Sequence, residues 1–197
     1  MAFLNPISFR PAFRRWRVAS WALLALALGA TSGVARAQTP ISSENQLKAA
    51  FLFKLAQFLD WPANAFPESK SPIVIGVLGD DPFGSYLDDF VQGEKIGERP
   101  MVVQRFRRVE DVATCQILFV SRSEAVRLDK ILGTLKGRCI LTVGDVEGFA
   151  SQGGMVRFAT EGGKIQLRIN VTAAKAAELT ISSKLLAHAT ILAPGKD

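Results

Sequence analysis

The sequence predicts an α/β fold: a single domain with a mixed, mainly parallel sheet flanked by helices and an antiparallel C-terminal hairpin. Two observations predict it. Continuous apolar runs, typical of strands buried on both faces, alternate with helical patterns between residues 73 and 143. Beyond them, residues 155–159 and 164–170 flank Gly162 and Gly163, a pair that suits a tight hairpin turn.

The first predicted helix covers residues 44–59. Ser42 or Ser43 can cap it, and Pro62 stops it because proline disfavours helix at the preceding residue. Phe53 faces away from the apolar stripe, which leaves two interpretations: the helix packs between the sheet and another helix, or Phe53 belongs to a protein-interaction surface. The stripe itself recurs at helical spacing and consists of Leu47, Phe51, Leu55, Phe58 and Leu59.

The remaining elements follow in order along the chain. The sequence predicts strands at 73–78, 101–106, 116–120 and 139–143, and helices at 85–92, 109–113 and 124–135. Asp81 is a candidate cap for the helix at 85–92, with Pro82 in its first turn. Two short helices close the domain, at 173–178 and 183–190, with Ser182 capping the second.

The first 37 residues have the pattern of a cleavable signal peptide. They carry five arginines and no acid, followed by an apolar run and a small-residue stretch. The predicted cleavage site lies between Ala37 and Gln38. A membrane anchor is the alternative, but it needs about 20 apolar residues and this run has about 13. We therefore expect a signal peptide (1–37), a linker (38–43), a periplasmic domain (44–192) and a tail (193–197).

Removing the signal peptide changes the charge balance. The whole chain has 24 basic and 18 acidic residues and a net charge of +6. The five arginines of the leader account for most of this excess, so the exported part has a net charge of about +1. A nucleic-acid-binding domain needs a basic surface to neutralise phosphates, and we expect no nucleic-acid partner.

Two cysteines, Cys115 and Cys139, would lie in a compartment that permits disulfides. Each precedes an apolar run. If the runs are neighbouring parallel strands in register, the two Cα atoms would lie about 4.8 Å apart, which is within disulfide range. The alternative is a pair of reduced cysteines that pack as small apolar residues.

The residues do not assemble into a recognisable catalytic or metal site. The loop from Gly79 to Gly84 lacks the glycine spacing of dinucleotide or phosphate sites, and Asp80 and Asp81 would repel an anion there. His188 is the only histidine, which excludes a two-histidine metal site. The sequence therefore predicts a protein that is not an enzyme and has no cofactor.

Several segments, taken in order, resemble the YfiR-like family of periplasmic regulators. The resemblance extends from about residue 45 to 191. Its landmarks are residues 47–62 (LKAAFLFKLAQFLDWP), 76–84 (GVLGDDPFG), 115–121 (CQILFVS), 141–143 (LTV), 153–156 (GGMV), 169–170 (IN) and 179–186 (LTISSKLL).

The resemblance implies a homodimer that binds and represses a membrane-bound diguanylate cyclase, or another inner-membrane sensor, and so lowers cyclic-di-GMP. An outer-membrane lipoprotein is a second implied partner. The candidate partner or dimer contacts are Phe53, Trp61, Phe66, Leu185 and His188. The alternative function is a periplasmic small-ligand-binding sensory module, with a pocket beside the Gly79–Gly84 loop.

Overall fold

The structure, a computed structural model, describes residues 42–193 and 195–197, which belong to one compact unit. The predicted signal peptide, its cleavage site at Ala37 and Gln38, and most of the predicted linker lie outside the described residues. Within the described part of the chain, no helix is long and apolar enough to cross a membrane.

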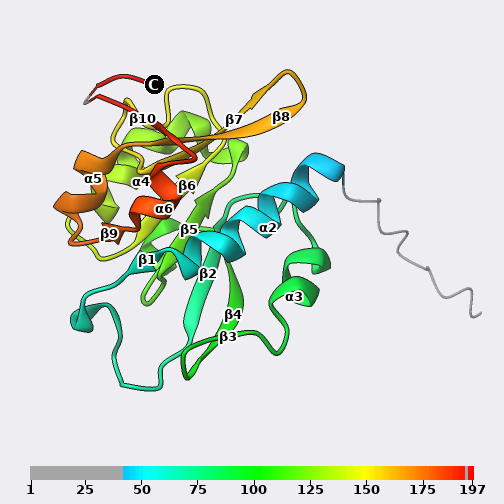
Figure 1. The fold of residues 1–197 in the computed structure, drawn as a ribbon, viewed down its shortest axis with the longest axis vertical. Helices are drawn as coiled ribbons and strands as arrows, with labels where there is room; N and C mark the ends of the chain where they lie inside the picture. The colour runs from blue at the N-terminus through cyan, green and yellow to red at the C-terminus, as the bar shows by residue number, and fades with distance from the viewer. Residues whose placement is uncertain (1–41, 194) are drawn as a thin grey trace, which may run out of the picture. The chain divides into compact units, whose positions relative to one another are not determined.

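An eight-stranded mixed sheet forms the centre of the domain, in the order β10-β8-β7-β6-β5-β2-β4-β3 (Figure 1). The neighbouring pairs from β4 through β2, β5 and β6 to β7 are parallel, while β8 runs antiparallel to β7. The predicted α/β class is confirmed. The strands are β2 Ile73–Leu78, β3 Lys95–Ile96, β4 Arg99–Phe106, β5 Ile117–Val120, β6 Leu141–Gly144, β7 Val156–Glu161, β8 Lys164–Ile169 and β10 Thr190–Ile191.

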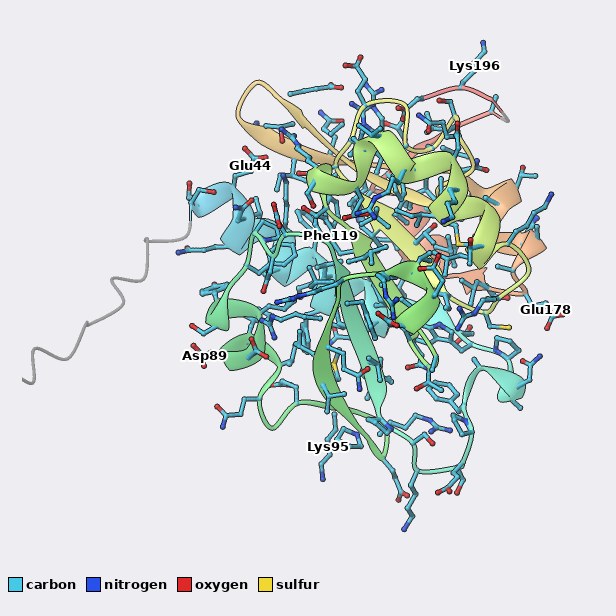
Figure 2. All side chains as sticks on the ribbon, turned by 180° about the vertical axis from the view of Figure 1, so that it is seen from behind. Glu44, Asp89, Lys95, Phe119, Glu178 and Lys196 are labelled. Atoms are coloured by element: carbon cyan, nitrogen blue, oxygen red, sulfur yellow. The ribbon has the colours of Figure 1, made fainter. Side chains whose placement is uncertain are left out.

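The central strands are apolar because helices cover both of their faces. Every residue of β2, β5 and β6 is buried. One core cluster lies on the side of α2 (Ser43–Gln57) and α3 (Ser85–Val91), and a second lies under α4 (Leu128–Leu135). Phe119 occupies the centre of the first cluster (Figure 2), with its ring centroid 4.9 Å from that of Phe83.

The predicted hairpin is confirmed. β7 and β8 pair antiparallel from Val156 opposite Ile169 to Glu161 opposite Lys164. Gly162 and Gly163 connect them with φ values of 55° and 74°. Glycine suits both positions, because residues with a side chain rarely adopt positive φ values at two successive positions.

The buried face of α2 differs from the predicted stripe. Ser42 caps the helix, accepting a hydrogen bond from the Asn45 N–H at 3.2 Å. However, Leu47 is 45% exposed, and its neighbour Lys48 is buried instead. The face that packs on the sheet consists of Lys48, Ala49, Leu52, Leu55 and Ala56. The prediction was wrong for Leu47, whereas Leu55 and Leu59 are buried and Phe51 and Phe58 pack against the core, as the stripe predicted.

Two other predicted helices begin differently. Gly84, not Asp81, precedes the first helical residue of α3, and Asp81 instead accepts a hydrogen bond from the Phe83 N–H at 2.7 Å. The helix predicted at 124–135 starts as a 3-10 segment, η3 (Arg122–Arg127), before α4. Of the two C-terminal helices, α5 (Val171–Ala176) has the predicted length but begins two residues earlier, and α6 (Ser183–Leu186) is shorter than predicted.

Short pairings that the sequence did not predict close the ends of the fold. β1 (Leu59–Asp60) pairs antiparallel with β9 (Thr180–Ile181). β10 joins the sheet beside β8, and β3 adds an antiparallel edge to β4. Each of these pairings has only two residue pairs, which is too short to leave a clear pattern in the sequence, and β1 and β9 are more than 100 residues apart in the chain.

Both cysteines are free thiols in the structure, which corresponds to the reduced alternative. The expected register is present, because β5 pairs Ile117 with Leu141, the same offset that separates the cysteines. However, the ladder of β6 begins only at Leu141, so Cys139 precedes the strand. Cys115 is buried in the core cluster under α4, whereas Cys139 packs against the cluster on the α2 side.

Candidate functional site

The Trp61 turn lies beside the C-terminal helix because β1 pairs with β9. The Ser182 N–H donates to the Phe58 carbonyl at 2.9 Å and extends this pairing towards α6. Two candidate contact regions that are more than 100 residues apart in the chain therefore lie near one another. The sequence could not predict this, because the pairing involves only four residues.

An aromatic and cationic cluster fixes the Trp61 turn. The Trp61 and Phe66 rings meet edge to face with centroids 6.4 Å apart, and the Arg99 guanidinium lies 3.7 Å from the centre of the Phe66 ring. Arg99 also donates to the carbonyls of Glu68 and Ser71, at 3.1 and 2.8 Å. Trp61 and Phe66 are both half-buried, so each presents part of a rigidly held ring to the surface.

The structure distinguishes the two candidate contacts on α6. Leu185 is buried in the main core cluster, where it helps to hold α6 against the domain. His188 follows the helix and is exposed. Of this pair, His188 is therefore the side chain available to a partner.

Phe53 belongs to a short aromatic strip on the surface of α2 and α3. Its ring meets Phe90 edge to face at 5.4 Å, and Phe90 lies 5.9 Å from Tyr86. All three side chains are half-buried. Phe53 thus has a structural neighbour on α3 and still contributes to a surface. We call Phe53, Tyr86 and Phe90 the aromatic strip.

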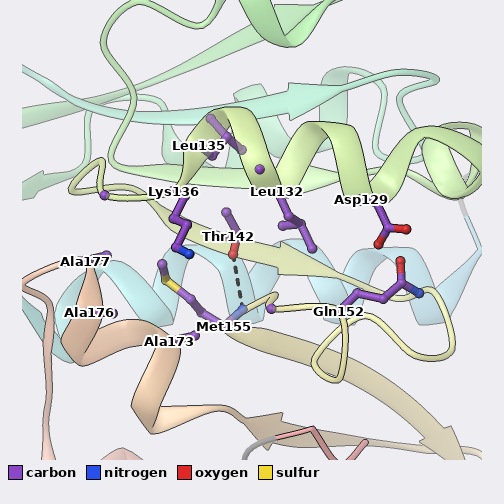
Figure 3. Close-up of a pocket in the computed structure, with 13 residues that line it drawn as sticks. Asp129, Leu132, Leu135, Lys136, Thr142, Gln152, Met155, Ala173, Ala176 and Ala177 are labelled. Atoms are coloured by element: carbon purple, nitrogen blue, oxygen red, sulfur yellow. Dashed lines mark hydrogen bonds between the residues drawn. The ribbon is translucent and has the colours of Figure 1, made fainter.

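An apolar groove of about 320 Å³ lies between α4 and α5 (Figure 3). Leu132 and Met155 contribute its larger apolar side chains, while Thr142 accepts a hydrogen bond from the Met155 N–H at 3.1 Å. Asp129 of α4 and Lys136, which directly follows α4, line it with opposite charges. This groove could not be predicted from local patterns, because its lining combines α4, the loop before β7, and three alanines of α5 and its C-terminal end: Ala173, Ala176 and Ala177.

The loop after β2 is packed rather than open at Gly79. A side chain there would collide with Ser123 Oγ at 2.4 Å and with Glu124 at 2.8 Å. Ser123 Oγ also accepts a hydrogen bond from the Asp80 N–H at 2.9 Å. η3 therefore fills the space directly beside Gly79, whereas a hollow of about 300 Å³ lies at the Pro82 end of the same loop.

The aspartates around this loop have structural partners. Asp88 and Asp81 both accept hydrogen bonds from the Arg105 side chain, the Asp81 contact measuring 2.7 Å. These bonds, led by that to Asp88, raise the pKa of Arg105 above its usual value. Across the described residues, no group of three or more His, Cys, Asp or Glu side chains is arranged to hold a metal ion.

A buried ionic cluster at the carboxyl edge of the sheet was not predicted. Lys48 Nζ lies 2.7 Å from Glu44 Oε1 and 2.6 Å from Asp145 Oδ2, and Arg122 Nε lies 3.2 Å from the same Asp145 oxygen. The hydrogen bond from Lys48, followed by one from Thr160, lowers the pKa of Glu44. The sequence feature that could have indicated this cluster is a lysine on an otherwise apolar helix face.

The fold is an α/β domain that carries aromatic and apolar surface regions. A sequence model of the family described as YfiR/HmsC-like matches residues 45–190, and the chain belongs to this family. The family is a regulatory one. A search of curated proteins found no match.

Proposed function

We propose that the protein is a periplasmic regulator that binds the periplasmic part of a membrane-bound diguanylate cyclase and represses it. The observation that carries this proposal is the family match over residues 45–190, since YfiR/HmsC-like proteins are periplasmic regulators. Repression lowers cyclic-di-GMP in the cytoplasm. Because the exported domain never meets the cytoplasm, its effect passes through the membrane-spanning partner.

The aromatic strip is the contact surface that we assign to this partner. Aromatic side chains are enriched among the residues that contribute most to protein–protein affinity, because they bury a large area at a small cost in side-chain entropy. Phe53, Tyr86 and Phe90 lie together and are each half-exposed. We also propose that the protein forms a homodimer. An outer-membrane lipoprotein would compete with the cyclase for binding to it.

The Trp61 turn and His188 form a second exposed region at the β1–β9 end of the domain. Trp61, Phe66 and His188 are held by the pairing of β1 with β9 and by the Arg99 contacts. We assign this region to the second protein contact, either the dimer or the lipoprotein.

Complementation of a deletion strain tests the assignment of the aromatic strip. Phe53→Ala should fail to restore low cyclic-di-GMP, while Leu47→Ala on the same helix should restore it. Leu47 is a matched control because it is an exposed apolar side chain with no part in the strip. Both variants should appear in the periplasm in equal amounts. Full restoration by Phe53→Ala would remove the strip from the partner surface.

A further inference from the structure

β4 lies near an edge of the sheet, and its outer neighbour β3 covers it only in part. β4 spans eight residues, Arg99–Phe106, and β3 pairs only with the first two of them. The Met101 N–H donates to the Glu94 carbonyl at 3.0 Å, and the cover ends there. Within the described part of the chain, no segment pairs with residues 102–106 on the side away from β2. A free edge of five residues, about 16 Å long, is therefore left.

The backbone of this free edge offers unpaired donors and acceptors. The Gly79 N–H donates to the Phe106 carbonyl at 3.0 Å, so Phe106 directs its backbone groups towards β2. These directions alternate along a strand, so the backbone groups of Gln104 also point to β2, while those of Val103 and Arg105 point outwards. Unpaired N–H and C=O groups at a sheet edge form a template for another strand.

The side chains along the free edge favour such pairing. Val103 packs against the core cluster on the α2 side, and Val102 and Phe106 pack against the cluster under α4, yet all three are only half-buried. Proline and charged side chains are what usually protect an edge from pairing. Residues 102–106 include no proline, and the one charge among them, on Arg105, is matched by Asp81, whose Oδ2 atom lies 2.7 Å from Nε. A strand alongside would cover the exposed parts of the apolar side chains.

We propose that this edge pairs with the same edge of a second copy of the chain, antiparallel and centred on Gln104. The inference rests on the homodimer of the proposed function and names its interface. Two-fold symmetry places Gln104 opposite Gln104 of the second copy, and Val102 opposite Phe106 of the second copy on the same face of the joined sheet. Val103 of each copy lies opposite Arg105 of the other, and these two pairs exchange four backbone hydrogen bonds.

A second copy is the occupant that we assign because the edge is complementary to itself. Gln104 is the midpoint of residues 102–106, so the register centred on it uses the whole free edge and stops where the cover by β3 begins. An aliphatic side chain meets an aromatic one at both ends, and Arg105 faces a valine, so no like charges lie directly opposite one another. This assignment leaves the Trp61 turn and His188 to the lipoprotein.

Sedimentation velocity of the chain from Gln38 onwards measures the dimer. Wild-type protein should pass from monomer to dimer as its concentration rises to about 1 mM, a range chosen because the interface is small. Gln104 is exposed, and Gln104→Lys places two like charges opposite each other, so the dissociation constant should rise at least about tenfold. Gln166→Lys makes the same change at an exposed position of β8 and should leave the constant unchanged. A protein that stays monomeric, or a dimer that Gln104→Lys does not weaken, overturns the proposal.

Cross-linking tests the register of the pairing. Opposite residues of a non-hydrogen-bonded antiparallel pair have Cα atoms about 4.5 Å apart, which is within disulfide range. With oxidised glutathione as the oxidant, Gln104→Cys should give a covalent dimer on a non-reducing gel, whereas Gln166→Cys should not. Equal cross-linking of the two variants, or none in Gln104→Cys, contradicts pairing centred on Gln104. Both assays contain only this chain, so their failure would remove this interface without bearing on cyclase repression.

Discussion

Removing the charge of Asp145 should destabilise the domain strongly. In Asp145→Asn the size of the side chain is retained, but Lys48, whose side chain is 3% exposed, loses one of its two carboxylate partners. Breaking a buried ion pair by removing one partner typically costs about 3–5 kcal/mol. Lys48 keeps Glu44, whose side chain is 41% exposed, so we expect the lower end, about 3 kcal/mol.

Urea unfolding followed by the fluorescence of Trp61 measures this loss. For a domain of this size, about 3 kcal/mol corresponds to a fall of roughly 6–12 °C in the melting temperature. The slope of the urea transition should not change, because the folded surface is the same. Glu147→Gln, an exposed carboxylate two residues further on, should change the free energy of unfolding by less than about 0.5 kcal/mol. A loss below about 1 kcal/mol in Asp145→Asn would refute the reasoning about the cluster.

Three further predictions concern packing, thiols and export. Gly154→Ala should lower the free energy of unfolding by about 1–3 kcal/mol, because the new methyl group would lie 2.7 Å from a backbone oxygen. Gly133→Ala should raise it by about 0.5–1 kcal/mol, because a methyl group at this position in α4 points into open space. Thermal unfolding of both variants measures the two changes. Thiol titration of unreduced, denatured protein should find two thiols per chain, and finding none would indicate a disulfide between Cys115 and Cys139. In the native protein Cys115 should not react, since burial raises its pKa to about 12 and leaves roughly one molecule in ten thousand as thiolate at pH 8, whereas Cys139 is partly exposed. N-terminal sequencing of periplasmic protein should begin at Gln38, and an intact leader would contradict signal cleavage.

The central strands and the β7–β8 hairpin were predictable because their signals are local. Ile73–Leu78 is a run of six residues that are all buried, so composition alone identifies β2. Gly162 and Gly163 have the positive φ values that the tight turn between β7 and β8 requires. In each case the residues that show the sequence pattern are the same residues that form the strand or the turn.

The ionic cluster and the surfaces were not predictable, because they depend on contacts between distant segments. Lys48 is buried only because Asp145, 97 residues later, meets it at 2.6 Å. A helical periodicity analysis treats lysine as polar and therefore placed Leu47 on the buried face. Similarly, Phe53 was recognised as unusual, but its neighbour Phe90 became apparent only when α3 packed beside α2.

The most direct test of the proposed function is the cellular concentration of cyclic-di-GMP after deletion of the gene. Repression of a diguanylate cyclase predicts a rise in cyclic-di-GMP and in surface attachment, reversed when the exported protein is supplied again. A version without residues 1–37 should not reverse it, because the protein would remain in the cytoplasm. Unchanged cyclic-di-GMP in the deletion strain would contradict the cyclase-repressor account.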